Sequence, residues 1–532
     1  MPKVVFIPLD DRPVNWKYPL MLSKVGGLDV VIPPRDYLGW WTQSPGKGNK
    51  IARWLKDIVN PAFKGGVKEG IDALIVSIDM LSFGGLIASR TPKVTFNGAV
   101  ERIGVLKEIR KSFPHLPIYA FNILMRLSIS ATSQEDLRDY KNIFRYSEIV
   151  DKVELLGKEK DRQELRLLER KIPPQVLEDY LYVRRRNHNL NLKVVEQVGE
   201  GVIDYLIIAQ EDAAQFGLHQ REQKELLLKI KELSLQEKVY IHPGADEVGM
   251  VLLARYLNQS SGFAPRIFIH PTSQEGLEVT PLYEDRPLLL SIKAQVKAIG
   301  GKIVDTVQSA DFILVVNTPF KKQEDLIEEE GIEKRERGLI NFVSAVEGYL
   351  KEGRIVALAD LFLVNGADRE LVSLLKERIE LPKLSAYAGW NTAGNSLGTA
   401  LSQACFKMFS RKNVRAQCTM PLQAQIEFLL VRFLDDWIYQ AVVRPEVNHY
   451  LTKELKASIW NLKKNYKKAE VLVQEKMQVS AKRLFEEYFR GKEVGEGLKI
   501  EDLTKCKTRL PWPRTFEVGI EIKLKIKDKN AK

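Results

Sequence analysis

The sequence predicts an α/β protein with several domains, and three observations carry this prediction. Short apolar, β-branched segments alternate along the chain with segments of helical periodicity, a pattern typical of parallel sheets joined by crossover helices. The 532 residues exceed the roughly 100–200 residues of a single domain. With 45% hydrophobic and 28% charged residues, the composition is that of a globular chain and excludes disorder or collagen-like repeats.

Residues 1–262 are predicted to form the first domain, a barrel-like α/β catalytic domain. Its helices are expected at segments such as 99–113, 159–169 and 221–233, between short apolar strands. The number of these strands and the length of the region match a (β/α)8 barrel, although the last strand could instead open the next domain. The predicted strands are 3–8, 28–32, 72–78, 117–122, 150–155, 203–209, 238–242 and 266–270.

Residues 263–410 are predicted to form a second, doubly wound α/β domain, because strands and helices continue to alternate there. The expected strands are 302–305, 312–316, 355–359 and 384–387, and the expected helices are 287–299, 338–350, 369–378 and 395–409.

Residues 411–532 are predicted to form a basic, mainly helical C-terminal appendage with a terminal strand. Helical periodicity runs through 422–439 and 453–489, and a β-like segment follows at 513–526. The region holds 26 Lys and Arg against 16 Asp and Glu, a net +10 of the total +12. No nucleic-acid motif accompanies this charge, so we expect a solvated basic face and no specific nucleic-acid partner.

The cysteines and the apolar segments favour a cytoplasmic protein. Cys405, Cys418 and Cys506 form no C-x-x-C pair, which argues against a disulfide framework and against a thiolate zinc site. The apolar segment near the N-terminus is too short for a signal peptide and ends in Asp10 and Asp11. No segment reaches about 18 uninterrupted apolar residues, so no membrane span is predicted.

Polar side chains gather where the predicted strands of the first domain end. In parallel α/β folds the loops after the carboxyl ends of the strands form the binding site. Several of these loops carry two acidic residues, more than a helix N-cap needs, although an N-cap or a surface ion pair is the alternative for each residue. We therefore expect these residues to bind a small-molecule or carbohydrate substrate. They are Asp10, Asp11, Arg12, Asp79, Asn122, Asp212 and His242.

The segment after the strand at 238–242 carries the sharpest motif, His242-Pro-Gly-Ala-Asp-Glu. It resembles the H-x-G-[GA]-D-E motif of the hexosaminidase-type glycoside hydrolases. The resemblance implies that Asp246 orients the acetamido group of a substrate and that Glu247 protonates the leaving oxygen. Substrate-assisted cleavage of this kind is an exception to the usual two-carboxylate scheme. The match is short, Ala245 replaces one glycine, and the motif follows a different strand from the one that the family uses.

A further polar loop, 387–404, lies between the last strand and the following helix of the second domain. Glycines with Asn, Thr and Ser at a helix N-terminus could offer amides to a hydroxyl-rich ligand, and a Trp ring could stack on a sugar. Helix capping and close packing are the alternative. The loop contains neither a Walker A pattern nor G-x-G-x-x-G. The predicted substrate-binding residues here are Trp390, Asn391 and Asn395.

Metal binding is the alternative for the same strand ends. His219, His242 and His270 follow or end predicted strands and could join neighbouring Asp residues on zinc or manganese. The sequence lacks H-x-H and H-E-x-x-H, and it also lacks the G-x-S-x-G elbow of serine hydrolases. We predict no cofactor and no metal, and we keep metal-dependent hydrolysis and non-catalytic binding of a small ligand as alternatives.

Four segments together resemble the bacterial domain-of-unknown-function family 4127 over most of the chain. They are IPLDDRPVN near the start, SIDMLSFGGLIASR (77–90), HPGADEVGMVLLAR (242–255) and AGWNTAGNSLGT (388–399). The resemblance implies that these segments belong together, and it brings no reaction or cofactor. From the residues themselves we predict a cytoplasmic hydrolase that acts on a sugar-containing substrate by carboxylate acid/base catalysis, with Glu247 as the acid and Asp246 beside it.

Overall fold

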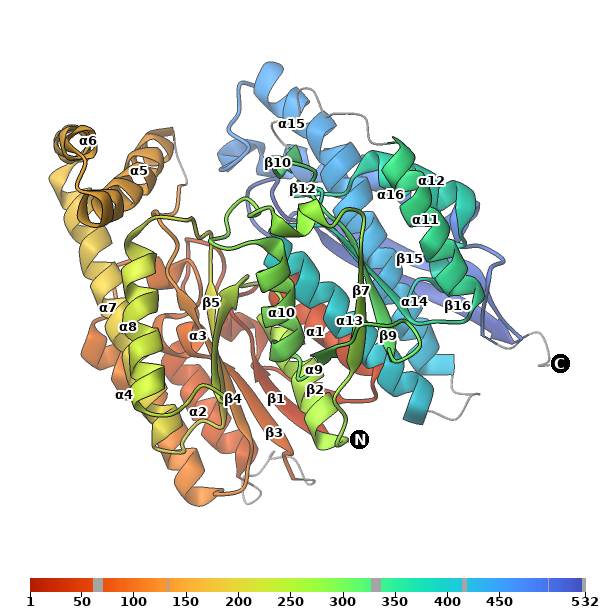
Figure 1. Ribbon diagram of the computed structural model, residues 1–532, viewed down its shortest axis with the longest axis horizontal. Helices are drawn as coiled ribbons and strands as arrows, with labels where there is room; N and C mark the ends of the chain where they lie inside the picture. Colours follow the sequence, from red (N-terminus) through yellow and green to blue (C-terminus); the bar gives the residue numbers. More distant parts are fainter. Residues whose placement is uncertain (61–69, 132–133, 327–335, 414–418, 496, 529–532) are drawn as a thin grey trace. The chain divides into compact units, whose positions relative to one another are not determined.

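The computed structural model describes residues 1–60, 70–131, 134–326, 336–413, 419–495 and 497–528. The chain divides into two compact units, each with its own parallel sheet (Figure 1). Unit 1 comprises Met1–Trp16, Leu28–Leu252 and Tyr283–Asp285, and unit 2 comprises Lys17–Gly27, Leu253–Leu282 and Arg286–Lys532.

Unit 1 is built on a six-stranded parallel sheet with the order β2-β1-β3-β4-β5-β6. Val4 of β1 pairs with Ala73 of β3, and Tyr119 of β4 pairs with Tyr205 of β5. The residues of β3 and β4 are buried throughout, which explains why the sequence shows continuous apolar segments rather than alternation. The strands are β1 (Lys3–Ile7), β2 (Asp29–Val31), β3 (Ala73–Ser77), β4 (Ile118–Leu124), β5 (Tyr205–Gln210) and β6 (Val239–Pro243).

This sheet is open, with β2 and β6 at its edges, so the expected closed barrel is not formed. Residues 150–155, expected as a strand, belong to helix α5 (Gln134–Leu156). Ile143, Tyr146 and Ile149 recur there at helical spacing and pack in a small separate core. The segment expected at 266–270 forms a strand of the unit 2 sheet instead. Six strands therefore remain in this sheet, where a barrel needs eight.

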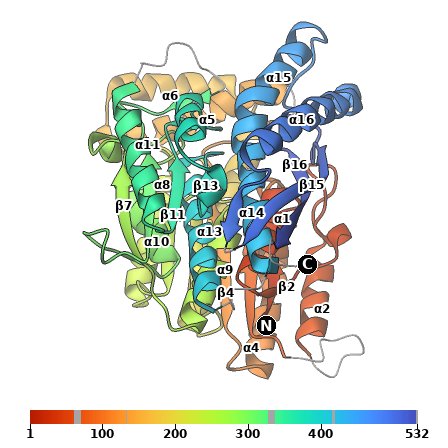
Figure 2. The ribbon, with the colours of Figure 1, turned by 90° about the vertical axis from the view of Figure 1, so that its right-hand side faces the viewer.

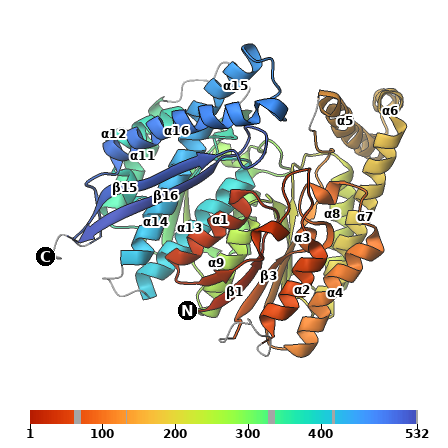
Figure 3. The same cartoon turned by 180° about the vertical axis from the view of Figure 1, so that it is seen from behind.

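Helices α2, α4, α7 and α8 lie along one face of the unit 1 sheet, where α2 packs on α4, α4 on α7 and α7 on α8 (Figure 3). This is the arrangement that right-handed crossovers produce when successive strands are added in one direction. Helices α1 (Pro13–Val25) and α9 (Val248–Ser260) begin in unit 1 and continue into unit 2. The other helices are α2 (Gly48–Val59), α3 (Ile78–Phe83), α4 (Phe96–Ser112), α6 (Glu159–Lys171), α7 (Pro174–Gly199) and α8 (Leu218–Glu232).

The direction of strand addition reverses between β1 and β3, because the chain passes from β1 out to β2 and then back to β3. In open α/β sheets such a reversal places a crevice at the carboxyl ends of the two strands. Gly84 and Gly85, with φ of 90° and 112°, form the turn after α3. A Cβ on Gly84 would lie 2.4 Å from the carbonyl oxygen of Gly46, so only glycine allows this close approach.

Unit 2 contains a five-stranded parallel sheet with the order β13-β11-β9-β7-β8. Its helices lie on both faces, with α10 packed on α13 and α11 packed on α12 (Figure 2). An open parallel α/β sheet is what the sequence predicts for this region. The strands are β7 (Arg266–Pro271), β8 (Lys302–Ile303), β9 (Phe312–Asn317), β11 (Val356–Asp360) and β13 (Ala386–Ala388), with a small pair β10 (Glu324–Asp325) and β12 (Leu363–Val364). The helices are α10 (Leu288–Ala298), α11 (Glu336–Lys351), α12 (Arg369–Arg378) and α13 (Ala393–Asn413).

The C-terminal part of unit 2 combines helices with a three-stranded antiparallel sheet, β14-β15-β16. Of the helix expected over 453–489, only 466–488 form a long helix, α16, because Lys456 and Lys463 adopt positive φ in the turns between the end of α15 and α16. Cys405 and Cys506 are free thiols, and Cys418 lies outside the described residues. In the part of the chain that the structure describes, no helix is long and apolar enough to cross a membrane. The elements are α14 (Thr419–Arg432), a π-helix (Phe433–Val443), α15 (Arg444–Lys453), α16 (Tyr466–Tyr488), β14 (Glu493–Gly495), β15 (Leu498–Arg509) and β16 (Gly519–Asp528).

Short 3-10 turns complete the described structure. They are Arg35–Tyr37, Ala88–Arg90, Glu275–Glu278, Leu381–Lys383 and Lys463–Asn465.

Candidate functional site

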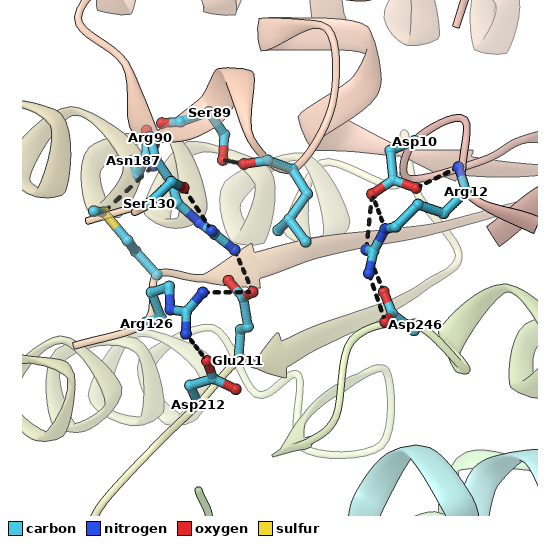
Figure 4. A network of polar contacts seen from close by, with 12 residues as sticks. Asp10, Arg12, Ser89, Arg90, Arg126, Ser130, Asn187, Glu211, Asp212 and Asp246 are labelled. Carbon is cyan, nitrogen blue, oxygen red and sulfur yellow. Dashed lines mark hydrogen bonds and ion pairs between the residues drawn. The ribbon is translucent and has the colours of Figure 1, made fainter. Parts of the chain in front are cut away.

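The carboxyl edge of the unit 1 sheet carries two separate centres of arginine and carboxylate side chains (Figure 4). Five of the six strands, all except β2, contribute at least one charged or polar residue to these centres from the loop that follows them, as expected for a parallel sheet. We name the two centres after their arginines. The Arg12 centre consists of Asp10, Arg12, Asn15 and Asp246, and the Arg126 centre consists of Arg90, Arg126, Glu211 and Asp212.

In the Arg12 centre one guanidinium group lies between two carboxylates. Arg12 donates from Nε and Nη2 to Asp10 Oδ2 at 2.9 and 2.8 Å, and from Nη1 and Nη2 to Asp246 at 3.0 and 2.6 Å. Asn15 Nδ2 donates to Asp10 Oδ1 at 2.8 Å and to Asp246 Oδ1 at 3.2 Å. The arginine and both carboxylates are buried. Burial raises the pKa of Asp246 and Asp10 adds to the rise, while Arg12 opposes it.

The Arg12 centre connects the loop after β1 with the loop after β6, two strands that are not neighbours in the sheet. Asp10, Arg12 and Asn15 follow β1, whereas Asp246 follows β6 and precedes α9. Gly249, in the first turn of α9, lies against the ring of Phe6 in β1, so a Cβ there would be 2.6 Å from Cζ of that ring. The segment after β6 therefore returns to β1, and Arg12 fixes it there.

Glu247, the predicted acid, is fully buried and lies folded back on its own loop. Its Oε2 accepts a hydrogen bond from the Ala245 amide at 2.8 Å, and its Oε1 lies 4.0 Å from Nδ1 of His242. Gly244 has φ of 120°, and a Cβ on it would be 2.1 Å from Glu247 Oε1, so glycine is required beneath this carboxyl group. The roles that the hexosaminidase motif implies for Asp246 and Glu247 stay predictions.

The Arg126 centre brings together residues from the loops after three adjacent strands, β3, β4 and β5. Arg90 Nη2 pairs with Glu211 Oε1, and its Nη1 donates to Ser130 Oγ at 2.8 Å. Arg126 Nη2 pairs with Asp212 Oδ2, and its Nη1 lies 3.9 Å from Glu211 Oε1. Two guanidinium groups therefore face two adjacent carboxylates.

This second centre is more open and less completely paired than the first. The side chains of Arg126 and Asp212 are 19% and 20% exposed, whereas that of Arg90 is 4% exposed. Among the described residues, Nε of Arg90, Nε of Arg126 and Oε2 of Glu211 have no hydrogen-bond partner. Asp212 has φ of 40°, a conformation that residues other than glycine rarely adopt. Unpaired buried groups and backbone strain are both concentrated at functional sites.

The two carboxyl groups of the Arg126 centre have opposite pKa shifts. Burial raises the pKa of Glu211, but the charges of Arg90 and Arg126 outweigh burial and bring the pKa below its ordinary value. Burial also raises the pKa of Asp212, and the negative charge of Glu211 adds to the rise against the pull of Arg126. The pair therefore favours one ionised carboxylate beside one that accepts a proton more readily.

Asp79, in α3 directly after β3, and Asn122, in β4, are buried with their polar groups in the protein interior. Asp79 Oδ2 accepts a hydrogen bond from the amide of Ile123 at 2.8 Å, and burial raises the pKa of Asp79 to about 7. Asn122 donates to Asn191 of α7 at 2.5 Å. Both side chains are buried and fix the end of β4. Asp11 is also buried, and its carbonyl oxygen accepts from Trp16 Nε1 at 3.1 Å.

Trp390, Asn391 and Asn395 belong to unit 2, the first two in the turn between β13 and α13 and Asn395 in the first turn of α13. Asn391 has φ of 71°, and its carbonyl oxygen accepts from the amide of Asn365 at 3.1 Å. Asn395 Nδ2 donates to Thr392 Oγ1 at 2.9 Å. These contacts are those of a capped helix start, and the proposed binding role of the three residues stays a prediction.

Three members of the Arg126 centre are not among the residues that the sequence selects: Arg90, Arg126 and Glu211. Glu211 directly follows β5, and Arg126 comes shortly after β4, so their positions after strand ends are a usable signal. Arg90 lies well beyond β3, after α3 and the glycine turn, and nothing in its spacing marks it.

Within the described ranges, no group of three or more His, Cys, Asp and Glu side chains is arranged to hold a metal ion. The histidines of the metal alternative are engaged in other ways. His242 Nδ1 lies 3.0 Å from the carbonyl oxygen of Pro243, and His270 Nδ1 lies 2.8 Å from the hydroxyl of Tyr349. His219 is buried, and its Nε2 accepts from the amide of Ala214 at 3.3 Å.

The open parallel sheets and the charged carboxyl edge of unit 1 define an α/β protein with two compact units and a polar centre where β3, β4 and β5 end. The chain belongs to the family described as protein of unknown function, DUF4127, which matches residues 4–521. No curated protein matches the chain. The family covers both units, in agreement with the four motif segments that resemble it.

Proposed function

We propose that the protein is a hydrolase that acts on a sugar-containing small molecule by carboxylate acid/base catalysis at the Arg126 centre. The observation that carries this proposal is the adjacent pair Glu211 and Asp212, partly exposed at the carboxyl edge and with pKa values shifted in opposite directions. Two carboxyl groups whose environments separate their pKa values can divide the roles of acid and base.

Asp212 is the proposed general acid. With its raised pKa it holds a proton more readily than Glu211, and its side chain is 20% exposed, so it can meet a leaving-group oxygen. Glu211 is the proposed ionised partner, held in that form by Arg90 and Arg126. Its charge can activate a water molecule or stabilise the positive charge that develops on a sugar ring.

Aromatic residues after β2 support a sugar as part of the substrate. Tyr37, Trp40 and Trp41 lie in the loop that leaves the carboxyl end of β2, on the same edge of the sheet, and all three are partly exposed. Flat rings of this kind can pack on the apolar face of a sugar. The backbone of Trp40 pairs with that of Ser44 at 2.8 and 3.2 Å, which holds the loop in a defined shape.

The test is hydrolysis of a panel of aryl glycosides, including N-acetylhexosaminides, by the wild type and by Asp212→Asn. Loss of a general acid lowers turnover by about 100-fold to 10,000-fold, and we expect a loss in that range. Glu159→Gln, on the exposed surface of α6, is the matched control and should keep wild-type turnover. Turnover that survives in Asp212→Asn would contradict the assignment. Thermal stabilisation by a sugar without any turnover would favour the non-catalytic binding alternative.

A further inference from the structure

We propose that the Arg126 centre binds an oxyanion on the substrate, a carboxylate or a phosphate, and that this anion replaces Asp212 as the partner of Arg126. This inference rests on the proposed function and names its substrate class, an acidic sugar such as a uronic acid or a sugar phosphate. Arginine forks suit both groups, because they match the planar carboxylate and the phosphate with parallel hydrogen bonds.

The first support is the incomplete pairing of the two arginines. In the part of the chain that the structure describes, Nε of Arg90 and Nε of Arg126 donate to no acceptor. A buried N–H of a charged group that lacks an acceptor is costly, so its presence calls for an explanation. An oxyanion at the centre would supply the missing acceptors.

The second support is that one of the two ion pairs is open to an incoming group. Arg126 and Asp212 are 19% and 20% exposed, whereas Arg90 and Glu211 are 4% and 12% exposed. An anion that approaches the edge of the sheet therefore meets the Arg126–Asp212 pair first. In this exchange Arg126 gives up one carboxylate and gains another oxyanion, and the displaced Asp212 side chain already reaches water, so no charge is left buried without a partner.

The third support is the charge of the centre. Two arginines face two carboxylates, so the four groups sum to zero when both acids are ionised. Uptake of a proton by Asp212 leaves one net positive charge, which an anionic substrate neutralises. Binding of the anion and protonation of Asp212 therefore favour each other, and the substrate itself would prepare the proposed acid for proton donation.

The arginines are also held in place before a ligand arrives. Arg184 of α7 donates to the carbonyl oxygens of Arg126 and Met125 at 2.8 and 3.1 Å, which fixes the chain after β4. The guanidinium of Arg126 lies 5.4 Å from the centre of the Tyr140 ring. Ser130 accepts from Arg90 at 2.8 Å. A pre-formed pair of forks lowers the entropy cost of binding.

Isothermal titration of the full chain with inorganic phosphate, D-glucuronate and neutral D-glucose tests the inference without any need for turnover. We expect at least one of the two anions to bind at least about tenfold more tightly than glucose. Arg126→Gln should weaken anion binding by at least about tenfold, since it removes the fork. Arg166→Gln, an exposed arginine on α6 with the same change of charge, should leave binding unchanged.

Asp212→Asn gives a second test, in which the expected result is tighter binding. A misfolded variant would bind more weakly, so it cannot produce this result. The amide has the shape of the carboxyl group but does not compete for Arg126 with a charge, so we expect anion binding to become at least about threefold tighter. Binding of glucuronate alone identifies a carboxylate, and binding of phosphate alone identifies a phosphate. Equal binding of glucose and both anions, or no anion binding at all, overturns the inference.

The two proposals fail in different ways. Anion binding that needs Arg126, without hydrolysis of any glycoside, would keep this inference and contradict the proposed function. Hydrolysis of neutral glycosides that depends on Asp212, without preference for an anion, would keep the proposed function and contradict the inference.

Discussion

The Arg12 centre and the Arg126 centre use the same chemical groups on the same edge of one sheet, yet they differ in how completely those groups are paired. Arg12, Asp10 and Asp246 are 5%, 7% and 4% exposed, and four hydrogen bonds from the guanidinium reach the two carboxylates. In the Arg126 centre the side chains of Arg126 and Asp212 are 19% and 20% exposed. Three buried polar atoms there, Nε of Arg90, Nε of Arg126 and Oε2 of Glu211, lack hydrogen-bond partners among the described residues.

The difference teaches that charge alone does not identify a binding site. A complete set of hydrogen bonds offsets the desolvation free energy of buried charges and leaves no donor or acceptor for a ligand to bind. An incomplete set leaves donors and acceptors that a ligand can satisfy. The Arg12 centre is therefore best understood as a link between β1 and the segment after β6, whereas the Arg126 centre has the unpaired groups that our proposal assigns to substrate binding and catalysis.

The largest expected effect comes from replacing the arginine of each centre in turn, which tests whether the two centres differ in their contribution to stability. Arg12→Met leaves two buried carboxylates without their counter-charge and should lower the free energy of unfolding by about 3–5 kcal/mol. Arg126→Met should cost less than about half as much, because water reaches Asp212. Urea unfolding followed by circular dichroism measures both.

Arg166→Met serves as the control for the loss of an exposed arginine on the same unit. If Arg126→Met proved as destabilising as Arg12→Met, the distinction between a structural and a functional centre would fail.

Asp79, buried directly after β3, allows a second test, through the pH dependence of stability. Burial raises its pKa from 3.8 to about 7, so between these values the folded protein holds a proton that the unfolded chain has lost. Its contribution to stability is therefore complete at low pH, falls by about 1.4 kcal/mol per pH unit across this range, and is lost above about pH 7.

Asp79→Asn should remove this slope, so its stability relative to the wild type should rise as the pH increases from about 4.5 to about 7.5. The measurement is urea unfolding of both proteins at several pH values. Asp36→Asn, whose side chain is 67% exposed, is the control for replacing an exposed aspartate by asparagine. A constant difference between Asp79→Asn and the wild type would show that Asp79 is ionised across this range.

The sequence predicts the strands of unit 1 well, because buried parallel strands are continuous apolar segments and β1, β3 and β5 are of this kind. It misplaces residues 150–155, where the spacing of Ile149, Val150 and Val153 is helical and only the rest of α5 makes that clear. Sheet closure is a property of all the strands together, so no local pattern decides between an open sheet and a barrel. Strand β15 is not predicted either, because charged residues occupy many of its positions and interrupt the apolar pattern of a strand.

The sequence predicts where the residues of the candidate site lie along the chain, but not which of their side chains pair with each other. Asp10, Arg12 and Asp212 follow strand ends, and this rule of parallel sheets depends only on the sequence order of strands. The pairing of Arg90 with Glu211, and of Arg126 with Asp212, depends on which strands are neighbours and on how far each loop reaches. Those distances follow from the packing of α3 and α7, which the sequence does not specify locally.

The smallest expected effect concerns Glu247, where the motif and the geometry lead to different expectations. The motif implies that Glu247→Gln abolishes turnover. Its burial and its hydrogen bond to the Ala245 amide imply a structural role instead, with a loss of stability of about 1 kcal/mol. Because the Arg126 centre would keep its acid, we expect turnover per folded molecule to change by less than about threefold.

Turnover of Glu247→Gln should be measured beside that of Asp212→Asn on the same glycoside, with urea unfolding to correct for the folded fraction. A small effect at Glu247 with a large one at Asp212 would assign the chemistry to the open centre. The reverse result would assign the chemistry to Glu247, in the buried loop after β6. Glu247 would then have to leave the Ala245 amide to reach a substrate, so the loop of Gly244 would be the part of unit 1 that opens during the reaction.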